Sequence, residues 1–600
     1  MDKNTAEIDI NDIEEFEDEE VEDSEMGTRA LKYLTADIVI YGGSFAGCAA
    51  AMKASEISPD KSIVLIITDP IPYKLVSGYR KIKYTTKSLG GIGTVGGQNY
   101  FDIRYWSHSG TSTLAQAGSF PSWLNYEGQA YNTENMSSKL AYDLEYGSNG
   151  NINILAAYDI DDFETQNNPY RITSIYIKGI KRNTNTNYVE FSGTTRVKVT
   201  GTVFVDASED GKLTRIVNFG GTTGRYDWPA GKLDTGETVS DGQARQQAAT
   251  LMFKITNVSA PSAPDHGSNS KTVGHVTYTF KNGLAMLAYS DRVVYKDSLS
   301  AFYSFNEDTN VKNAGFALKP FNMARDGANT DEWWINALLV FNVDGRACKR
   351  DEGNSSIYPQ DMRSDYRDVD EAYADAVGFI NNNKSYIENA LRSYTGLGTT
   401  VEIVTDEEEN AIVGDVLYLR ETVHMAIYSY NRANGTEETN YQLGSTECNW
   451  SGEIPTGGYD TENYSTRIGL NYYWSDINAY KREDLQKTSG AYIWGEEIGQ
   501  ELRPDMWVTG STPLNPVYVP YNALTTKYVA NLLIPGYAVG ASSFAWSESR
   551  VIPNLCVLGD AAGVAAGYAV NNNKHPLQFT STDITAVQNL LVTLGAKINK

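Results

Sequence analysis

Apolar and polar positions predict alternating strands and helices near both ends of the chain. A continuous apolar run at 38–41 leads into the turn Gly42-Gly43-Ser44 and then into a helix of small residues at 48–54. A second apolar run, 62–68, follows that helix. Continuous apolar runs are typical of strands buried on both faces of a parallel sheet. The pattern therefore predicts a strand, a helix and a second parallel strand, which together form a βαβ unit.

Short β-type segments follow between 151 and 200, and they predict a meander that returns to the first strands. The predicted strands are Ile152–Ala157, Ile172–Lys178, Tyr188–Phe191 and Thr195–Val199. An apolar strand at 202–206 then ends in Asp206. Near the end of the chain the pattern predicts a strand at Leu555–Leu558, a turn at Gly559-Asp560 and a helix of small residues from Ala561.

The central region, 222–518, gives mixed signals that favour a separate substrate or cap lobe. The sequence contains 600 residues, too many for one hydrophobic core, so at least two lobes are expected. The elements predicted in this region are a helix at Gln243–Lys254, partial β structure at 273–290, a buried apolar stretch at Trp333–Val343 and an amphipathic helix at Asp368–Ser393.

The turn after the first strand is an incomplete dinucleotide fingerprint, G-x-S-x-x-G. Gly42 would make the tight turn, Gly47 would let the helix pack closely, and Ser44 stands where a glycine usually approaches phosphate. Asp69 follows the second strand. An acid at that place accepts hydrogen bonds from a ribose 2′-hydroxyl and repels a 2′-phosphate. FAD or NAD therefore fits better than NADP.

Two further segments have the composition of a nucleotide site. Five glycines occur within 88–102, and such a backbone can approach a flat ligand closely. A mobile surface loop is the alternative, but Leu89, Ile92 and Val95 favour a packed one. Asp206 ends a strand at the edge where open α/β sheets bind ligands, although an ordinary helix cap by Asp206 or Ser208 is nearly as plausible.

Candidate catalytic side chains are few. The segment Leu417–His424 is predicted to be helical, which would place Arg420 and His424 on one face. An ordinary helix with a salt bridge has about equal weight. A lone histidine, His108, is more often structural than catalytic.

Charge and cysteine usage exclude several classes of function. The net charge of −25 argues against binding to nucleic acid or anionic membranes. Residues 1–26 hold thirteen acids against one lysine, which is typical of a disordered tail, with a peptide that folds on a protein partner as the alternative. Four scattered cysteines suggest neither a disulfide scaffold nor a metal site. No signal peptide or apolar span is visible, so a cytoplasmic location is expected.

Four motifs in order resemble the glutathione-reductase-like flavoprotein superfamily. They are the strand, turn and helix at 37–54, the Leu-Gly-Gly-x-x-Thr-x-Gly-Gly loop at 89–97, Val-Asp-Ala-Ser-Glu-Asp-Gly at 205–211 and Gly-Asp-Ala-Ala-Gly at 559–563. More narrowly, Gly-Gly-Ser-Phe-Ala-Gly at 42–47 is similar to a variant found in a bacterial FAD-dependent oxidoreductase family. Segments typical of that family are matched at 420–422, 520–524 and 531–533.

The resemblance implies an α/β fold in which a Rossmann-like FAD-binding domain of glutathione-reductase type carries an inserted α+β substrate or cap domain. The expected parts are an acidic tail at 1–33, a first FAD-binding part at 34–221, the cap domain at 222–518 and a second FAD-binding part at 519–600. The residues that the resemblance places at FAD are Gly42, Gly43, Ser44, Phe45, Ala46, Gly47, Asp69, Gly90, Gly91, Thr94, Gly96, Gly97, Asp206, Ala207, Gly559, Asp560, Ala561 and Gly563.

Within that set, the resemblance places Gly42, Ser44 and Gly47 at the pyrophosphate and Asp69 at the adenosine ribose. It places Asp560 on the ribityl chain, with the helix from Ala561 directed at the flavin.

The expected chemistry is hydride transfer between a small organic substrate and FAD. Arg420 and Arg550 are candidates for holding an anionic substrate or reduced flavin, and His424 is a candidate base. Family members often have arginine at the position of Tyr537 and histidine at that of Ser543. The alternatives are a flavoprotein-derived fold that serves as a structural or binding component of an assembly, and a site that holds NAD.

Overall fold

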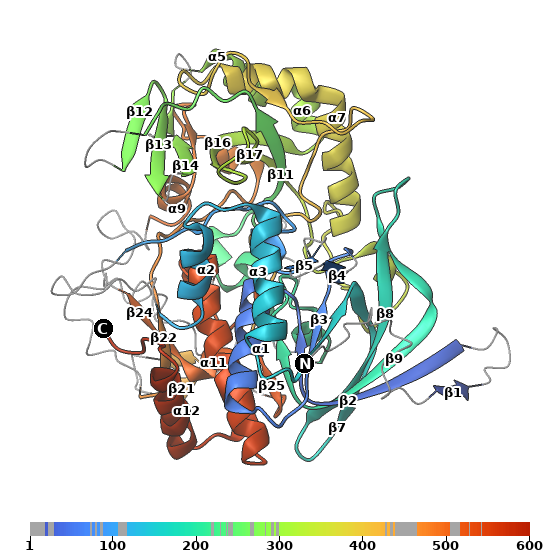
Figure 1. The fold of residues 1–600 in the computed structure, drawn as a ribbon. Coiled ribbons are helices and arrows are strands. Elements are labelled where there is room, and N and C mark those ends of the chain that lie inside the picture. Colours follow the sequence, from blue (N-terminus) through green and yellow to red (C-terminus); the bar gives the residue numbers. More distant parts are fainter. Residues whose placement is uncertain are drawn as a thin grey trace.

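The computed structural model of the chain contains two large β-sheets, each with its own helices (Figure 1). The residues that it describes are 18–21, 29–71, 75–78, 81–84, 88–105, 117–217, 221–228, 230–235, 237, 244–263, 269–281, 284–289, 293–295, 299–425, 429–431, 436–438, 465–504, 516–526, 528–541 and 543–600. His108 and most of the acidic N-terminal segment lie outside these ranges.

The first sheet has eight strands in the order β6-β3-β2-β9-β8-β7, with β1 paired to β2 and β25 paired to β9. β3, β6, β9 and β25 run parallel to their neighbours in its central part, and β7, β8 and β9 form an antiparallel meander. The strands are β1 (Asp18–Val21), β2 (Arg29–Tyr41), β3 (Ile63–Ile67), β6 (Ile152–Ala156), β7 (Tyr158–Gln166), β8 (Arg171–Arg182), β9 (Val189–Asp206) and β25 (Leu532–Leu533).

The parallel strands end together, as the βαβ prediction required. Tyr41 at the end of β2 pairs with Ile66 of β3 and with Asp206 of β9. The meander prediction is confirmed in outline, but the strands predicted at 188–191, 195–199 and 202–206 are one continuous strand, β9. The prediction missed β7. Asp18–Val21, inside the predicted tail, pairs with β2 as strand β1.

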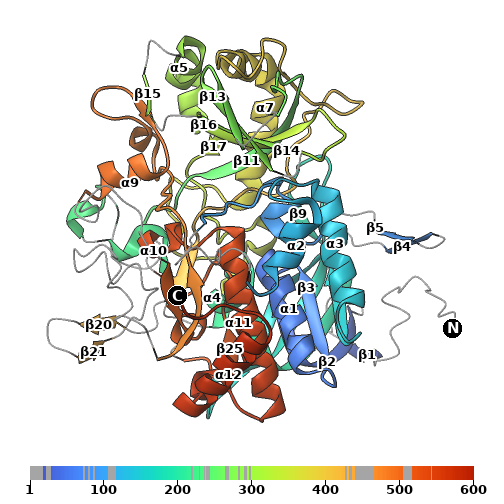
Figure 2. The ribbon, with the colours of Figure 1, turned by 60° about the vertical axis from the view of Figure 1, so that its left-hand side comes forward.

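Three helices cover one face of this sheet. α1 (Phe45–Ile57), α3 (Thr133–Tyr146) and α11 (Ile552–Asn571) run side by side (Figure 2), and two of them, α1 and α11, are rich in alanine and glycine. A Cβ at Gly559 would lie 2.3 Å from the carbonyl oxygen of Ala46, and one at Gly563 would lie 2.3 Å from that of Ala50. The two helices from opposite ends of the chain therefore approach at backbone distance. The remaining helices of this lobe are α2 (Phe120–Glu127), α4 (Lys212–Val217), α10 (Ser543–Ser547) and α12 (Ser581–Thr593).

The strand and turn predicted at Leu555–Asp560 are wrong, because α11 runs unbroken from Ile552 to Asn571. Val551 is its N-cap residue, and Pro553 stands in the first turn, where proline is well tolerated. A short apolar run has no periodicity that separates a buried strand from a buried helix. Asp560 consequently lies in the middle of a helix and not at the beginning of one.

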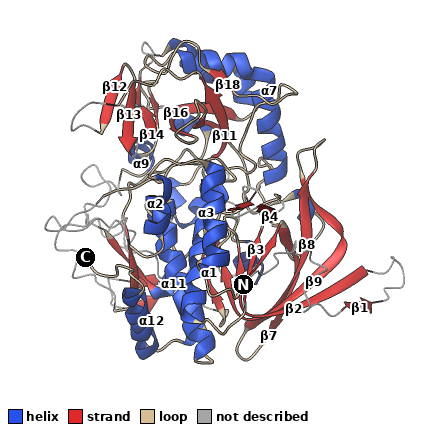
Figure 3. Cartoon of the chain, viewed as in Figure 1, coloured by secondary structure: helices blue, strands red, loops and turns tan. Residues whose placement is uncertain are grey.

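The second sheet is antiparallel, with seven strands in the order β12-β13-β14-β16-β17-β11-β18. Figure 3 shows the long helix α7 along the side of this sheet where β11 and β18 lie. The strands are β11 (Ala249–Thr256), β12 (Ser270–Val273), β13 (Val276–Lys281), β14 (Leu284–Tyr289), β16 (Phe316–Arg325), β17 (Trp333–Val340) and β18 (Glu402–Ile403), and the helices are α5 (Ser300–Glu307), α6 (Thr309–Asn313), α7 (Val369–Arg392) and α9 (Glu496–Leu502).

Predictions for this lobe are partly confirmed. β17 is buried at every position, and α7 is the predicted amphipathic helix. The helix predicted at Gln243–Lys254 is wrong, because Ala249–Thr256 forms strand β11 between β17 and β18.

Small two-stranded ladders complete the described fold. They join β4 (Leu75–Gly78) with β5 (Lys81–Tyr84), β10 (Gly221–Thr223) with β19 (Val423–Met425), β15 (Val293–Val294) with β23 (Tyr492–Ile493), β20 (Ser429–Asn431) with β21 (Thr436–Glu438), and β22 (Arg467–Asn471) with β24 (Val517–Pro520). Among the helices described, none combines the length and the apolar character needed to cross a bilayer.

Candidate functional site

A cavity opens at the carboxyl ends of β2, β3 and β9. This is the edge of an open α/β sheet where ligands bind. Its lining includes six of the residues predicted to contact the cofactor: Gly42, Gly43, Ser44, Asp69, Gly91 and Ala207. The structure thus gathers residues from three separate motifs around one space.

The glycine turn forms the floor of this cavity. Gly42 has φ of 109°, and a Cβ there would lie 2.6 Å from the carbonyl carbon of Ala207. Ser44 is the N-cap of α1: its Oγ donates to the carbonyl oxygen of Ala207 at 2.8 Å and accepts from the N–H of Gly47 at 3.4 Å. The serine that interrupts the fingerprint therefore joins the turn to β9 and caps the helix.

The first turn of α1 presents free donors. The N–H groups of Phe45 and Ala46 have no acceptor among the described residues. Such groups and the helix dipole attract an anion. Gly47 serves another purpose, because a Cβ there would lie 2.0 Å from the carbonyl oxygen of Gly42.

Asp69 lines the cavity one strand away, immediately after β3. Burial raises the pKa of its carboxyl well above the usual range, and the nearby Glu209 and Asp415 raise it further. Arg182, also in the cavity wall, acts in the opposite direction. A carboxyl at this place can accept hydrogen bonds from a ribose diol.

The 88–97 loop is packed, as Leu89, Ile92 and Val95 predicted, since all three are buried. Only Gly91 of its predicted cofactor residues lines the cavity. Gly97, with φ of 84°, lies against the other sheet, where a Cβ would be 2.6 Å from the Trp334 ring. The other members pack the loop: Thr94 hydrogen-bonds the carbonyl oxygen of Leu89, a Cβ at Gly90 would lie 2.7 Å from Thr94 Oγ1, and one at Gly96 would lie 2.2 Å from Ile92.

Asp206 caps the turn into α4, which is the alternative to ligand binding that the sequence left open. Its carboxylate accepts from the hydroxyls of Ser208 and Thr214, each at 2.6 Å, and from the N–H of Thr214 at 2.7 Å. It is fully buried and is not part of the cavity lining. The side chain organises the turn into α4, while the next residue, Ala207, faces the cavity.

Sequence reasoning missed Glu209, which lines the cavity beside the glycine turn. Its Oε1 accepts from the N–H of Ile92 at 2.9 Å, so it connects the end of β9 to the glycine loop. Burial raises the pKa of its carboxyl to about 7. The sequence did contain a signal for Glu209, because a second acid only three residues after Asp206 lies at the edge of the sheet where ligands bind.

The outer wall of the cavity includes Arg350, which sequence reasoning also missed. Its guanidinium donates to Asp159 at 2.6 Å, and Asp159 further accepts from Lys212 at 2.8 Å and from the Tyr41 hydroxyl at 2.5 Å. Lys212 also pairs with Asp351 at 2.8 Å. These buried charges join the first sheet to the segment that carries Arg350. No local motif signals them, because Tyr41, Asp159, Lys212 and Arg350 lie on four different elements.

Asp560, which the resemblance places on the ribityl chain, does not line the large cavity. Its carboxylate accepts from the N–H of Ser119 at 2.9 Å and from the Ser119 hydroxyl at 2.5 Å. Burial raises its pKa to about 6. Gly559, Asp560, Ala561 and Gly563 are all buried in α11, outside the lining of the described cavities. The structure therefore gives Asp560 a contact with the segment before α2.

A second polar region surrounds Tyr418. Arg550 donates to the Tyr418 hydroxyl at 2.8 Å and to the Asp476 carboxylate at 2.7 Å. The Arg420 guanidinium lies 4.0 Å from the centre of the Tyr418 ring and donates a long hydrogen bond, 3.4 Å, to Asn336. We call Tyr418, Arg420, Asp476 and Arg550 the arginine cluster, since these contacts join all four.

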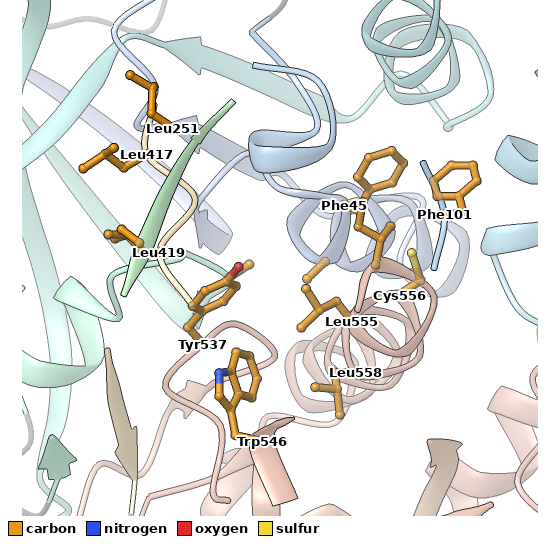
Figure 4. Packing of buried hydrophobic residues seen from close by; sticks show 14 of the residues in the cluster. Phe45, Phe101, Leu251, Leu417, Leu419, Tyr537, Trp546, Leu555, Cys556 and Leu558 are labelled. Atoms are coloured by element: carbon orange, nitrogen blue, oxygen red, sulfur yellow. The ribbon is translucent and has the colours of Figure 1, made fainter. Parts of the chain in front are cut away.

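The helix predicted at Leu417–His424 is wrong, so Arg420 and His424 do not share a helical face. Tyr418 bridges to Thr250, and the segment ends in strand β19. The sequence did contain a signal for an extended segment, namely apolar residues at every second position. Leu417 and Leu419 follow this alternation, and both line the large cavity. Figure 4 shows these two leucines on one side of Tyr537 and Trp546, with helix α11 on the other.

His424 is buried and pairs with Glu421, with 3.1 Å between Nε2 and Oε1. Its Nδ1 has no hydrogen-bond partner in the described part of the chain. Ser543 donates to the carbonyl oxygen of Gly224 at 2.8 Å and also hydrogen-bonds Glu421. Ser543, at the position where the resemblance implies a histidine, thus contacts the carboxylate that pairs with His424.

The parallel sheet, the glycine turn and the cavity at the strand ends define a dinucleotide-binding protein with a Rossmann-like fold. The chain belongs to the FAD-dependent oxidoreductase family, whose model matches residues 84–591. Its cofactor is accordingly FAD. The site residues fit this group, because Gly42 leaves no room for a side chain, Phe45 and Ala46 offer free N–H groups, and Asp69 stands at the next strand end.

Similarity to solved structures is distant. The chain is 8% identical to a geranylgeranyl bacteriochlorophyll reductase-like protein from Thermoplasma acidophilum, with a TM-score of 0.30 over 94% of this chain and 85% of that one. It is 11% identical to Aquifex aeolicus GidA, with a TM-score of 0.33 over 92% and 70%. With the myxobacterial halogenase CndH it shares 10% identity and a TM-score of 0.25 over 51% and 53%, so it spans about half of that protein. No curated protein matches the sequence. The family assignment therefore rests on the family model.

Proposed function

We propose that this protein transfers a hydride between a small organic substrate and bound FAD. One observation carries the proposal: a single glycine loop joins the large cavity to the arginine cluster. Gly91 lines the cavity, while Gln98, at the end of the same loop, accepts a hydrogen bond from Asn336 at 3.1 Å. Asn336 in turn accepts from Arg420. The nucleotide-binding edge is thus physically continuous with a buried group of charged side chains.

In this proposal, one set of residues binds the cofactor and another set binds the substrate and moves a proton. The first turn of α1 and Asp69 hold the adenosine diphosphate end, while Leu417 and Leu419 exclude water from the cavity wall. FAD, when bound, supplies the hydride acceptor or donor. Arg420 and Arg550 bind and orient a negatively charged group. His424, oriented by Glu421, is the candidate base.

The direct test is the content of the purified protein. We expect a yellow protein that releases FAD on denaturation, and anaerobic loss of the flavin absorbance when a substrate is added from a panel of alcohols, amines and hydroxy acids. A colourless protein that cannot be reconstituted with FAD contradicts the proposal and favours the structural or binding role predicted as the alternative. The family assignment favours FAD over NAD. Binding of a protein partner by the acidic N-terminal segment stays a prediction.

A further inference from the structure

The hydroxyl of Tyr537 is a buried polar group that the described fold leaves unused. Tyr537 is only 1% exposed, and its hydroxyl has no hydrogen-bond partner among the described residues. Buried polar groups in folded proteins are nearly always paired, so an exception requires an explanation. Burial also raises the pKa of this hydroxyl well above the usual range, so it keeps its proton. The side chain is therefore a neutral donor without an acceptor.

The backbone of Tyr537 is attached to the edge of the large cavity. Its N–H donates to the carbonyl oxygen of Ser208 at 3.1 Å, and the N–H of Gly536 donates to that of Asp206 at 3.1 Å. A Cβ at Gly536 would lie 2.5 Å from the carbonyl oxygen of Ser208, so the two segments touch. Ser208 and the next residue, Glu209, both line the cavity. The Tyr537 side chain thus begins at the nucleotide-binding edge.

The ring of Tyr537 connects this edge with the arginine cluster. It packs edge-to-face on Trp546, with 4.8 Å between the ring centres, and the Trp546 indole donates to the carbonyl oxygen of Arg420 at 2.9 Å. Figure 4 shows the Tyr537 hydroxyl at the end of the ring that points away from Trp546. The charges that act on this hydroxyl come from both regions, since Glu209 raises its pKa while Arg550 and Arg420 lower it.

Two more residues in contact with Trp546 carry buried polar atoms without a partner in the described chain. Arg420 has an unpaired Nε, and His424 has an unpaired Nδ1. The His424 ring lies 5.5 Å from the Trp546 ring. Three unsatisfied polar groups on one set of packed side chains indicate that a polar ligand completes this region.

From this arrangement we infer that the Tyr537 hydroxyl donates a hydrogen bond to the flavin ring of bound FAD. The flavin fits this position because it is covalently joined to the diphosphate, and the edge to which Tyr537 is attached is the one that binds dinucleotides. The inference deepens the proposed function and rests on its cofactor, but it requires no particular substrate. Reduction places negative charge on the flavin, so this hydrogen bond is stronger to the reduced form than to the oxidised form. Tyr537 therefore raises the flavin potential.

The test replaces Tyr537 by phenylalanine in the purified holoprotein. Tyr537→Phe removes only the hydroxyl and keeps the ring that packs on Trp546. We expect the preference of the protein for reduced over oxidised FAD to decrease about fivefold to tenfold, which lowers the two-electron potential by about 20–30 mV. The potential is measured by equilibration with a dye of known potential. The melting temperature should change little, because this hydroxyl has no partner in the described fold.

The matched control is Tyr521→Phe. Tyr521 is also buried, at 3% exposure, but its hydroxyl donates to the carbonyl oxygen of Pro576 at 2.9 Å. This variant should keep the wild-type potential and lose thermal stability, which is the reverse of the result expected for Tyr537→Phe.

An unchanged potential in Tyr537→Phe overturns the inference, and so does an equal shift in Tyr521→Phe. Weaker substrate binding by Tyr537→Phe with an unchanged potential also overturns it, because the hydroxyl would then serve the substrate. The FAD content of the wild-type protein is measured first. A wild-type protein that binds no FAD contradicts the proposed function together with this inference, whereas a flavoprotein whose potential ignores Tyr537 contradicts the inference alone.

Discussion

The large cavity and the arginine cluster are built in different ways. The edge of the cavity where the parallel strands end is made mainly by backbone: a left-handed glycine, the strand ends and, next to them, two free N–H groups at the start of α1. The arginine cluster is made by side chains from segments far apart in the sequence, among them Tyr418, Asp476 and Arg550. Backbone geometry is specified by a few adjacent residues, whereas a converging set of side chains depends on the whole fold. Local substitutions should therefore disable the first region more sharply than the second.

The largest effect is expected for Gly42→Ala. The new Cβ would lie 2.6 Å from the carbonyl carbon of Ala207, and φ of 109° is unfavourable for any other residue. We expect the free energy of unfolding to decrease by about 2–5 kcal/mol and bound FAD to be lost. Chemical denaturation and the flavin absorbance of the purified variant measure the two effects.

Gly150→Ala is its control, since Gly150 also has a positive φ, 75°, but open space around its Cβ position. This variant should keep FAD. Its free energy of unfolding should decrease by only about 1 kcal/mol, the cost of the backbone conformation. Equal losses in the two variants would show that contact with Ala207 is unimportant.

An intermediate effect is expected from Glu209. Its pKa is about 7 in the folded protein against 4.5 for an ordinary glutamate, so folding takes up a proton between these values. The free energy of unfolding should therefore decrease as the pH rises from about 4.5 to about 7, by up to about 3 kcal/mol. FAD should likewise bind more weakly at higher pH, since its diphosphate would meet a charged Glu209. Glu209→Gln should flatten both profiles in urea denaturation and in FAD titration.

Glu352→Gln provides the comparison for this experiment, because that exposed carboxylate pairs with Lys349 on the surface. It should leave the pH profile of the wild type intact. A Glu209→Gln variant with an unaltered profile would mean that another group titrates in this range.

The smallest effect is expected for Asp560→Asn. Loss of the charged hydrogen bonds to Ser119 is offset by relief from burying the charge, so stability should change by less than about 1 kcal/mol. If Asp560 only fixes α11 to the segment before α2, FAD content should be unchanged, and Ser119→Ala should behave alike. Loss of FAD in Asp560→Asn alone would instead support the ribityl contact that the resemblance implies. Flavin absorbance per protein decides between the two.

The sequence predicted well what is encoded locally. The βαβ unit, the role of Gly42 and the position of Asp69 follow from a few consecutive residues each. The helix predicted at Leu417–His424 was wrong because a salt-bridge spacing was preferred to the alternation of Leu417 and Leu419. The break predicted at Gly559 was wrong because that glycine is needed for contact with α1, which local sequence does not reveal.

Other site residues had no local signal at all. Arg350 and Asp159 acquire their importance only from neighbours on distant elements. The resemblance implies a histidine at the position of Ser543. The structure shows Ser543 hydrogen-bonded to Glu421, the partner of His424. The narrower resemblance of residues 42–47 to one family variant stays a prediction.

The contact between α1 and α11 has a consequence for synthesis on the ribosome. The strands and helix α1 of the first sheet emerge early, but the helix that covers α1 ends at Asn571, and strand β25 begins only at Leu532. The second sheet, in contrast, is contained between 249 and 403. The second sheet can therefore form during translation, whereas the first sheet is complete only after almost the whole chain has been synthesised. A nascent chain stalled before 532 would expose the apolar face of α1 and become a substrate for chaperones.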